Sequence, residues 1–229
     1  MTDFGNIIII GHRGAAGTVF ENTAESILAA IHIGVRYVEI DVWKTRDGEL
    51  ILYHDAYLER LTDQKGFIYD LDYESVQKIR LKNNASIPSL KDVINIAKTH
   101  HIKLLVEVKD ENAVKDAFHL LKSEMDFSDF IIGSFFHKPI MELKIQYPLV
   151  QTSVMLECVP VDFGHYLKRV NPDYVTVSVQ SYNEYLIKTV QDQQRRLVFY
   201  TVNSESEMKQ MLQINPWAII TDYPERFIK

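Results

Sequence analysis

Residues 38–55 read V-E-I-D-V-W-K-T-R-D-G-E-L-I-L-Y-H-D. β-Branched and aromatic residues dominate the first half of this stretch and predict a strand over residues 35–42. Side chains of a strand alternate between two faces, so Val38, Ile40 and Val42 would point one way and Glu39, Asp41 and Trp43 the other. Two carboxylates on one face are costly to bury alone, and a bound cation or a cationic side chain is expected beside them. The alternative is a solvated face whose surface ion pairs would be weak.

The second half of the stretch leads back toward these carboxylates. Asp47-Gly48 predicts a tight turn, and residues 49–53 predict a second short strand that ends in His54-Asp55. This hairpin would deliver a titratable imidazole close to the carboxylate pair.

Two other apolar runs also end in chemically active side chains. G-H-R-G at residues 11–14 follows the apolar run 7–10, and V-E-V-K at residues 106–109 ends another predicted strand. Parallel α/β folds keep their sites at the carboxyl ends of strands. The three stretches therefore point to one functional site.

Seven short motifs run through the chain: H-R-G at 12–14, E-N-T at 21–23, E-x-D at 39–41, D-G at 47–48, H-D at 54–55, E-x-K at 107–109 and T-D-Y-P at 221–224. No single motif is specific, but the ordered set resembles that of the glycerophosphodiester phosphodiesterase family from end to end. Phe20 stands where that family usually has proline, and Tyr200 stands where a tryptophan often precedes T-V-N. Neither departure touches a residue expected to do chemistry.

Strands and helices alternate regularly along the chain. Eight core strands, with residues 49–53 as an extra hairpin arm, favour an α/β fold of the (β/α)8 TIM barrel type over a doubly wound sheet. The predicted core strands are residues 6–11, 35–42, 103–108, 130–134, 151–156, 174–179, 197–202 and 218–221. A small insertion, residues 55–89, follows the second strand and would cover part of the site mouth. With 229 residues and 46% hydrophobic content, we expect one barrel domain over residues 1–229.

Glu39, Asp41 and Glu107 are the candidate metal ligands. Oxygen ligands without cysteine suit a hard divalent cation, Mg²⁺ or Ca²⁺, and so few protein ligands would leave positions open for water and a phosphate oxygen. The alternative is a network of ion pairs between these carboxylates and neighbouring cations.

His12 and His54 are the candidate acid and base, because imidazole titrates near neutrality and two of them flanking a phosphate can take and give a proton. The resemblance implies metal-dependent hydrolysis in which a glycerol hydroxyl of the substrate attacks phosphorus to give a cyclic phosphate, and an alcohol and glycerol 3-phosphate are the products. We assign His12 as the base and His54 as the acid of the first step. The roles reverse when water opens the ring.

Arg13 and Lys109 are the candidate substrate-binding residues. The fork of Arg13 fits phosphate oxygens, and Lys109 offers a compact charge on the same strand face as Glu107. Arg13 could instead be a surface arginine, and Lys109 could simply pair with Glu107. Trp43, Phe135 and Tyr200 could form a wall that receives the alcohol, or could be ordinary packing at a barrel rim.

The resemblance implies a small-molecule glycerophosphodiester as the partner, and composition argues against one other class of partner. A net charge of −6, with 31 acidic against 25 basic residues, argues against a nucleic-acid partner. The single cysteine, Cys158, excludes an internal disulfide, and we expect it to be buried. The first residues lack the pattern of a secretion signal, and the I-I-I-I run is too short to cross a bilayer, so we expect a cytoplasmic protein without stable membrane insertion. The oligomeric state stays open.

Two competing functions fit the same motifs. The two histidines and three carboxylates also resemble phospholipases of the sphingomyelinase D type, which are secreted and act at membranes, and activity on lysophospholipids would need an apolar groove. A non-catalytic barrel that binds phosphate is the alternative from another class. The presence of every expected acid, base and ligand argues against it.

Overall fold

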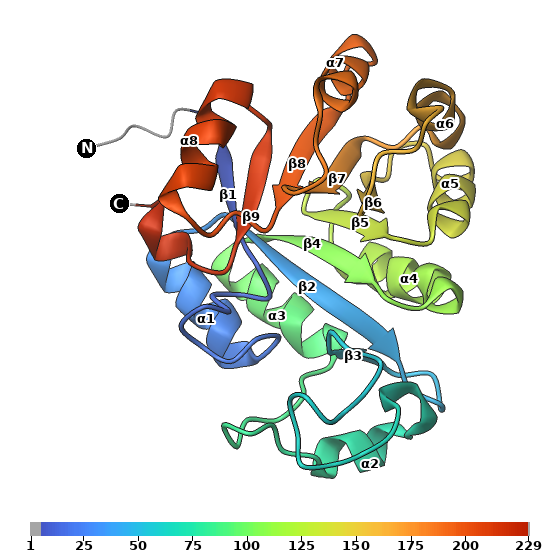
Figure 1. Ribbon diagram of the computed structural model, residues 1–229. Helices are drawn as coiled ribbons and strands as arrows, with labels where there is room; N and C mark the ends of the chain where they lie inside the picture. The colour runs from blue at the N-terminus through green and yellow to red at the C-terminus, as the bar shows by residue number, and fades with distance from the viewer. Residues whose placement is uncertain (1–5, 229) are drawn as a thin grey trace.

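Eight parallel strands close into a barrel in the computed structural model, which describes residues 6–228 (Figure 1). The strand order is β1-β9-β8-β7-β6-β5-β4-β2, and pairing of β1 with β2 closes the ring. The barrel strands are β1 (Ile8–Gly11), β2 (Tyr37–Lys44), β4 (Lys103–Val108), β5 (Phe130–Ser134), β6 (Thr152–Leu156), β7 (Tyr174–Ser178), β8 (Arg196–Tyr200) and β9 (Ala218–Thr221). The prediction of a (β/α)8 TIM barrel is confirmed.

Helices cover the outside of this barrel and connect its strands (Figure 1). They are α1 (Ala24–Ile33), α3 (Leu90–His100), α4 (Val114–Glu124), α5 (His137–Gln146), α6 (Phe163–Val170), α7 (Glu184–Asp192) and α8 (Glu205–Ile214), with short 3-10 turns η2 (Glu111–Ala113) and η3 (Pro224–Arg226). Capping boxes begin α3 and α8, in which Ser89 and Ser204 each accept a backbone N–H at the third helical position. The chain therefore specifies these two helix starts locally.

Two apolar layers hold the barrel together. The inner layer fills the barrel and includes Ile10, Leu105 and Val198, whereas the larger outer layer lies between strands and helices and includes Val38, Ile40 and Val42. The even-numbered side chains of β2 therefore face the helices, as the alternation predicts. The odd-numbered ones, Glu39 and Asp41, are left facing the barrel interior.

The insertion is a small unit with its own core. β3 (Leu50–Leu52) pairs antiparallel with β2, and residues 53–89 then carry η1 (Ile68–Asp70) and α2 (Tyr73–Lys78) before α3 begins. Figure 1 places this segment beyond the carboxyl end of β2. A separate cluster of buried apolar residues, among them Ile51, Tyr53 and Ile68, packs inside it. The insertion therefore adjoins the end of the barrel where a site is expected.

Some local predictions were wrong. β2 begins at Tyr37 and not at residue 35, because Gly34 ends α1 in the left-handed conformation and the Val35 N–H then bonds back to the Ala30 carbonyl. Cys158 is exposed and not buried, since it lies in the loop that follows β6. Residues 1–5, which carry much of the prediction about a secretion signal, and residue 229 lie outside the described residues.

Candidate active site

The register of β2 and β4 brings three acidic side chains together. Asp41 lies directly opposite Glu107 in the parallel ladder, and Glu39 lies two residues earlier on the same face of β2. All three side chains are buried, with relative exposures of 2% for Glu39, 1% for Asp41 and 8% for Glu107. One carboxylate oxygen from each lies within 4.8 Å of the other two.

Burial of three carboxylates together changes their acidity. Burial, reinforced by Asp41 and Glu107, raises the pKa of Glu39 well above its ordinary value. Burial and the charge of Asp41 likewise raise the pKa of Glu107 to about 7. Burial alone would also raise the pKa of Asp41, but the cations of Lys109 and Arg13 outweigh it and hold that pKa well below the ordinary value. Asp41 is therefore the permanently charged member of the group.

Arg13 and Lys109 pair with different oxygens of Asp41. Arg13 Nε lies 3.0 Å from Asp41 Oδ2, and the Arg13 backbone N–H donates to Glu39 Oε2 at 3.0 Å. Lys109 Nζ lies 2.9 Å from Asp41 Oδ1 and also contacts Glu107. The predicted pairing of Lys109 with Glu107 is thus present together with the carboxylate cluster.

The donor set fits a divalent cation. Glu39 Oε1 is buried with neither a hydrogen bond nor an ion pair among the described residues, whereas Asp41 Oδ1 and Glu107 Oε1 both pair with Lys109 Nζ. A buried carboxylate oxygen is rarely left without a partner, and three carboxylates with an oxygen each within 4.8 Å of the other two match the all-oxygen coordination of hard ions. The cluster of Glu39, Asp41 and Glu107 has the composition of a metal site.

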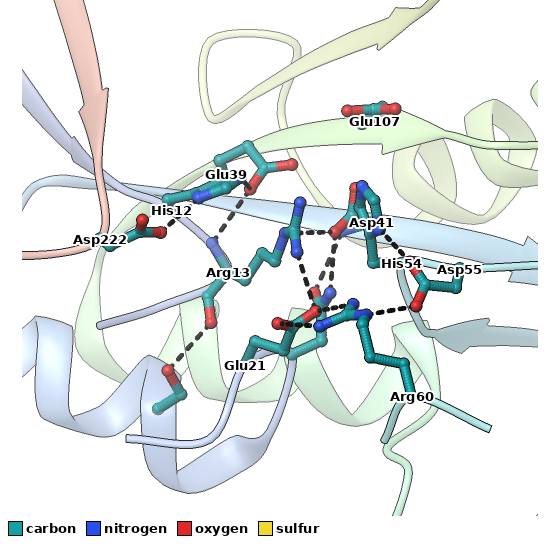
Figure 2. Close-up of polar contacts among 12 residues, drawn as sticks. His12, Arg13, Glu21, Glu39, Asp41, His54, Asp55, Arg60, Glu107 and Asp222 are labelled. Carbon is teal, nitrogen blue, oxygen red and sulfur yellow. Dashed lines mark hydrogen bonds and ion pairs between the residues drawn. The ribbon is translucent and has the colours of Figure 1, made fainter. Parts of the chain in front are cut away.

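His12 follows β1 and lies beside the carboxylates, paired with a residue from the other end of the chain (Figure 2). Its Nε2 is 3.9 Å from Glu39 Oε2, and its Nδ1 is 2.5 Å from Asp222 Oδ1. Because a carboxylate can only accept, Nδ1 carries a hydrogen and Nε2 is the atom available for proton transfer. Asn203 fixes Asp222 in turn, since its Nδ2 donates to Asp222 Oδ2 at 2.6 Å.

Replacing Asp222 by asparagine tests this pairing. We expect kcat to fall on the order of 10²- to 10⁴-fold with little change in KM, because the imidazole loses the partner that fixes its tautomer. Steady-state kinetics on a glycerophosphodiester measure the effect. Asp162→Asn is the matched control, since Asp162 contacts His165 at 2.8 Å on the protein surface. A kcat of D222N within twofold of wild type would show that Asp222 does not orient His12.

His54 is built in the same way on the opposite side of Asp41 (Figure 2). Its Nδ1–H donates to Asp55 Oδ1 at 2.6 Å, and its backbone carbonyl accepts the Trp43 indole N–H at 3.1 Å. Burial lowers the pKa of His54 despite the opposing charge of Asp41. Each predicted histidine thus has a carboxylate at Nδ1, which leaves Nε2 for proton transfer.

The structure brings all seven predicted site residues to one end of the barrel, and adds residues that sequence reasoning missed. Asp222 was not assigned a role, although it directly follows the last strand, where the rule applied to the other strand ends would have found it. Thr23 caps α1, and the preceding residue, Asn22, donates to Asp41 Oδ2 at 2.8 Å. Asn22 therefore holds a metal-ligand candidate in place.

The proposed aromatic wall is only partly assembled. Phe135 and Tyr200 meet edge to face, with ring centroids 6.2 Å apart. Trp43 packs instead with the insertion, its ring centroid 5.7 Å from that of Tyr69. Phe135 and Tyr200 are therefore the pair at the barrel rim, and Trp43 belongs to the insertion side of the mouth.

No helix within residues 6–228 has both the length and the apolar character needed to cross a membrane.

Comparison with known proteins gives one consistent result. Residues 12–226 match the model of the Glycerophosphoryl diester phosphodiesterase family. A glycerophosphodiester phosphodiesterase of Caldanaerobacter subterraneus is 26% identical over 238 residues, which cover 96% of each chain. The structure of an Oleispira antarctica phosphodiesterase in complex with the product sn-glycerol-3-phosphate superposes with a TM-score of 0.89 at 22% identity, covering 96% of this chain and 94% of that one. A glycerophosphodiester phosphodiesterase from Thermotoga maritima gives a TM-score of 0.82 at 22% identity, covering 96% of each chain.

Proposed function

Because this chain belongs to the glycerophosphoryl diester phosphodiesterase family, we propose that it hydrolyses glycerophosphodiesters to an alcohol and glycerol 3-phosphate. The reaction depends on a divalent cation, Mg²⁺ or Ca²⁺, held by Glu39, Asp41 and Glu107. A small-molecule phosphodiester is the substrate.

The net charge of the three carboxylates and the two cations beside them is the observation that supports this proposal. When the three carboxylates are ionised, as metal binding requires, they and the two cations in contact with them, Arg13 and Lys109, carry one net negative charge. A divalent cation would convert this to one positive charge, which a phosphodiester monoanion neutralises. The site is thus balanced for metal and substrate together, and such electrostatic preorganisation is usually the largest contribution to catalysis.

Each side chain has a role in this reaction. When bound, the metal ion supplies Lewis-acid polarisation of a phosphoryl oxygen. His12 removes the proton of the glycerol 2-hydroxyl, whose oxygen forms a bond to phosphorus, and His54 protonates the departing alcohol as its bond to phosphorus breaks. Arg13 and Lys109 neutralise the negative charge that gathers on the phosphoryl oxygens. The cyclic phosphate then opens by attack of water, with the two histidines exchanging roles.

Removal and return of metal tests the function. We expect EDTA to abolish hydrolysis of glycerophosphocholine and added Mg²⁺ or Ca²⁺ to restore it, because the carboxylates alone repel the phosphodiester. Release of glycerol 3-phosphate is the measurement, and glycerophosphoethanolamine and glycerophosphoglycerol complete the panel. No turnover with any substrate and either ion would contradict the proposal and leave a barrel that only binds phosphate.

A further inference from the structure

Arg60 extends from the insertion to two carboxylates that border the site (Figure 2). Its Nη1 and Nη2 donate to the two oxygens of Glu21 at 2.8 Å and 2.7 Å, and its Nε donates to Asp55 Oδ2. Every nitrogen of the guanidinium is therefore engaged with one of two acidic side chains. This fork-to-carboxylate geometry is directional as well as charged.

Each of these two carboxylates also accepts a hydrogen bond from a side chain that has a role in the proposed reaction. Glu21 Oε1 accepts a hydrogen bond from Arg13 Nη1 at 2.8 Å, and Asp55 Oδ1 accepts one from His54 Nδ1 at 2.6 Å. A single chain of contacts thus joins Arg13 to His54 through Glu21, Arg60 and Asp55. Arg60 lies in the first part of the insertion, five residues beyond Asp55.

The contacts of Arg60 orient Glu21 and Asp55 more than they stabilise the folded protein. The Arg60 side chain is 45% exposed, whereas Glu21 and Asp55 are 15% and 22% exposed. Ion pairs with one exposed partner contribute little to folding free energy. The two carboxylates are more shielded than Arg60, so its contacts restrict the directions in which they can point.

We propose that Arg60 is a positioning residue that orients two side chains of the site, His54 and Arg13. Through Asp55 it holds the His54 imidazole so that Nε2 faces the departing alcohol, and through Glu21 it holds the Arg13 fork toward the phosphoryl oxygens. The inference rests on the roles given to His54 and Arg13 in the proposed function. By this proposal the insertion contributes to catalysis, because it orients two side chains of the site.

Leaving-group dependence separates positioning from a structural role. Protonation by His54 accelerates the reaction strongly when the departing alkoxide is a strong base, as with choline, and has little effect when the leaving group is 4-nitrophenolate. For Arg60→Gln we expect kcat on glycerophosphocholine to fall about 10²-fold, because a small displacement of an acid is costly. On the 4-nitrophenyl ester of glycerol phosphate we expect kcat within threefold of wild type. KM should rise several-fold on both substrates, since Glu21, which accepts from Arg13 Nη1, loses the partner that restricts its direction.

Three further variants test the contacts of Arg60 with Asp55 and with Glu21. Asp55→Asn should reproduce the kcat defect, and Glu21→Gln should reproduce the KM defect. Arg60→Lys should not rescue, because an ammonium keeps the charge but cannot span both carboxylates. Arg46→Gln is the matched control, since Arg46 pairs with Asp72 at 2.8 Å at the edge of the insertion, without contact to the site. It should retain the wild-type kinetics.

A spectroscopic measurement that needs no turnover tests the role of Arg60 separately from the proposed function. Wild type that fails to hydrolyse any glycerophosphodiester would contradict that function, whereas ¹H–¹⁵N spectra of the His54 ring still test Arg60. We expect the Nδ1–H tautomer to predominate in wild type and in R46Q, and both tautomers to be populated in R60Q. An unchanged His54 tautomer in R60Q would overturn the proposal. Equal losses of kcat on both ester substrates, accompanied by a lower Tm, would overturn it as well.

Discussion

Replacing either His12 or His54 by alanine will lower kcat for glycerophosphocholine on the order of 10³-fold, because each imidazole transfers a proton in the first chemical step. The measurement is the steady-state release of glycerol 3-phosphate with metal present. Both side chains are partly exposed and lie outside the main apolar layers, so the fold should survive, as Tm will show. His165→Ala is the matched control, because His165 also pairs with an aspartate but is 85% exposed.

The 4-nitrophenyl ester of glycerol phosphate assigns the two roles. Its leaving group needs no proton, so His54→Ala should release nitrophenolate at close to the wild-type rate, whereas His12→Ala should remain slow. The cyclic phosphate should then accumulate in His54→Ala, because His54 acts as the base in ring opening. Accumulation in His12→Ala instead would reverse the assignment of acid and base.

Glu39→Gln will separate function from stability. We expect turnover to fall at least about 10²-fold, since a metal ligand and one charge of the site are lost. We also expect the metal-free variant to be more stable than wild type at pH 8. Burial and two neighbouring carboxylates raise the pKa of Glu39, so its ionised form destabilises the folded protein. A gain of about 1 kcal/mol would raise Tm by about 2–4 °C in a protein of this size.

The pH dependence of this difference follows from the same shift. A carboxyl whose folded-state pKa is raised binds its proton more tightly in the folded protein, so folding stability falls as pH rises from its unfolded pKa to its folded one. For Glu107 that interval runs from 4.5 to about 7. Metal-free wild type should therefore lose stability from pH 5 to pH 8, and the advantage of E39Q should shrink at pH 5. A lower Tm for metal-free E39Q at pH 8 would mean that the Glu39 carboxylate stabilises the fold through its contact with Arg13.

The cluster of three carboxylates could be predicted from the sequence because its geometry is mostly local. Alternation along one strand places Glu39 and Asp41 on the same face, and a parallel barrel puts the end of the next strand, with Glu107, beside them. His54 could be placed by the same logic, since a short hairpin returns the chain to the strand it left. These predictions needed only the period of a strand and the rule that parallel strands end together.

The environments of single side chains were less predictable. Cys158 was expected to be buried, yet it lies in an exposed loop, because a single cysteine carries no periodic signal. The grouping of Trp43 with Phe135 and Tyr200 was also incomplete. Trp43 shares the inner face of β2 with Asp41 by alternation, but the folded insertion provides the apolar surface against which it packs.

The sequence by itself determined the repeating strand and helix pattern and which three carboxylates and two imidazoles are the candidates for the site, since each depends on spacings within one or two neighbouring elements. Only the tertiary structure decided which carboxylate orients which imidazole. Asp222 reaches His12 across 210 positions because β9 pairs with β1 when the barrel closes, and Arg60 joins Glu21 to Asp55 because the insertion packs beside the carboxyl end of β2. Such contacts depend on closure of the whole ring and on side-chain directions, which no local period encodes.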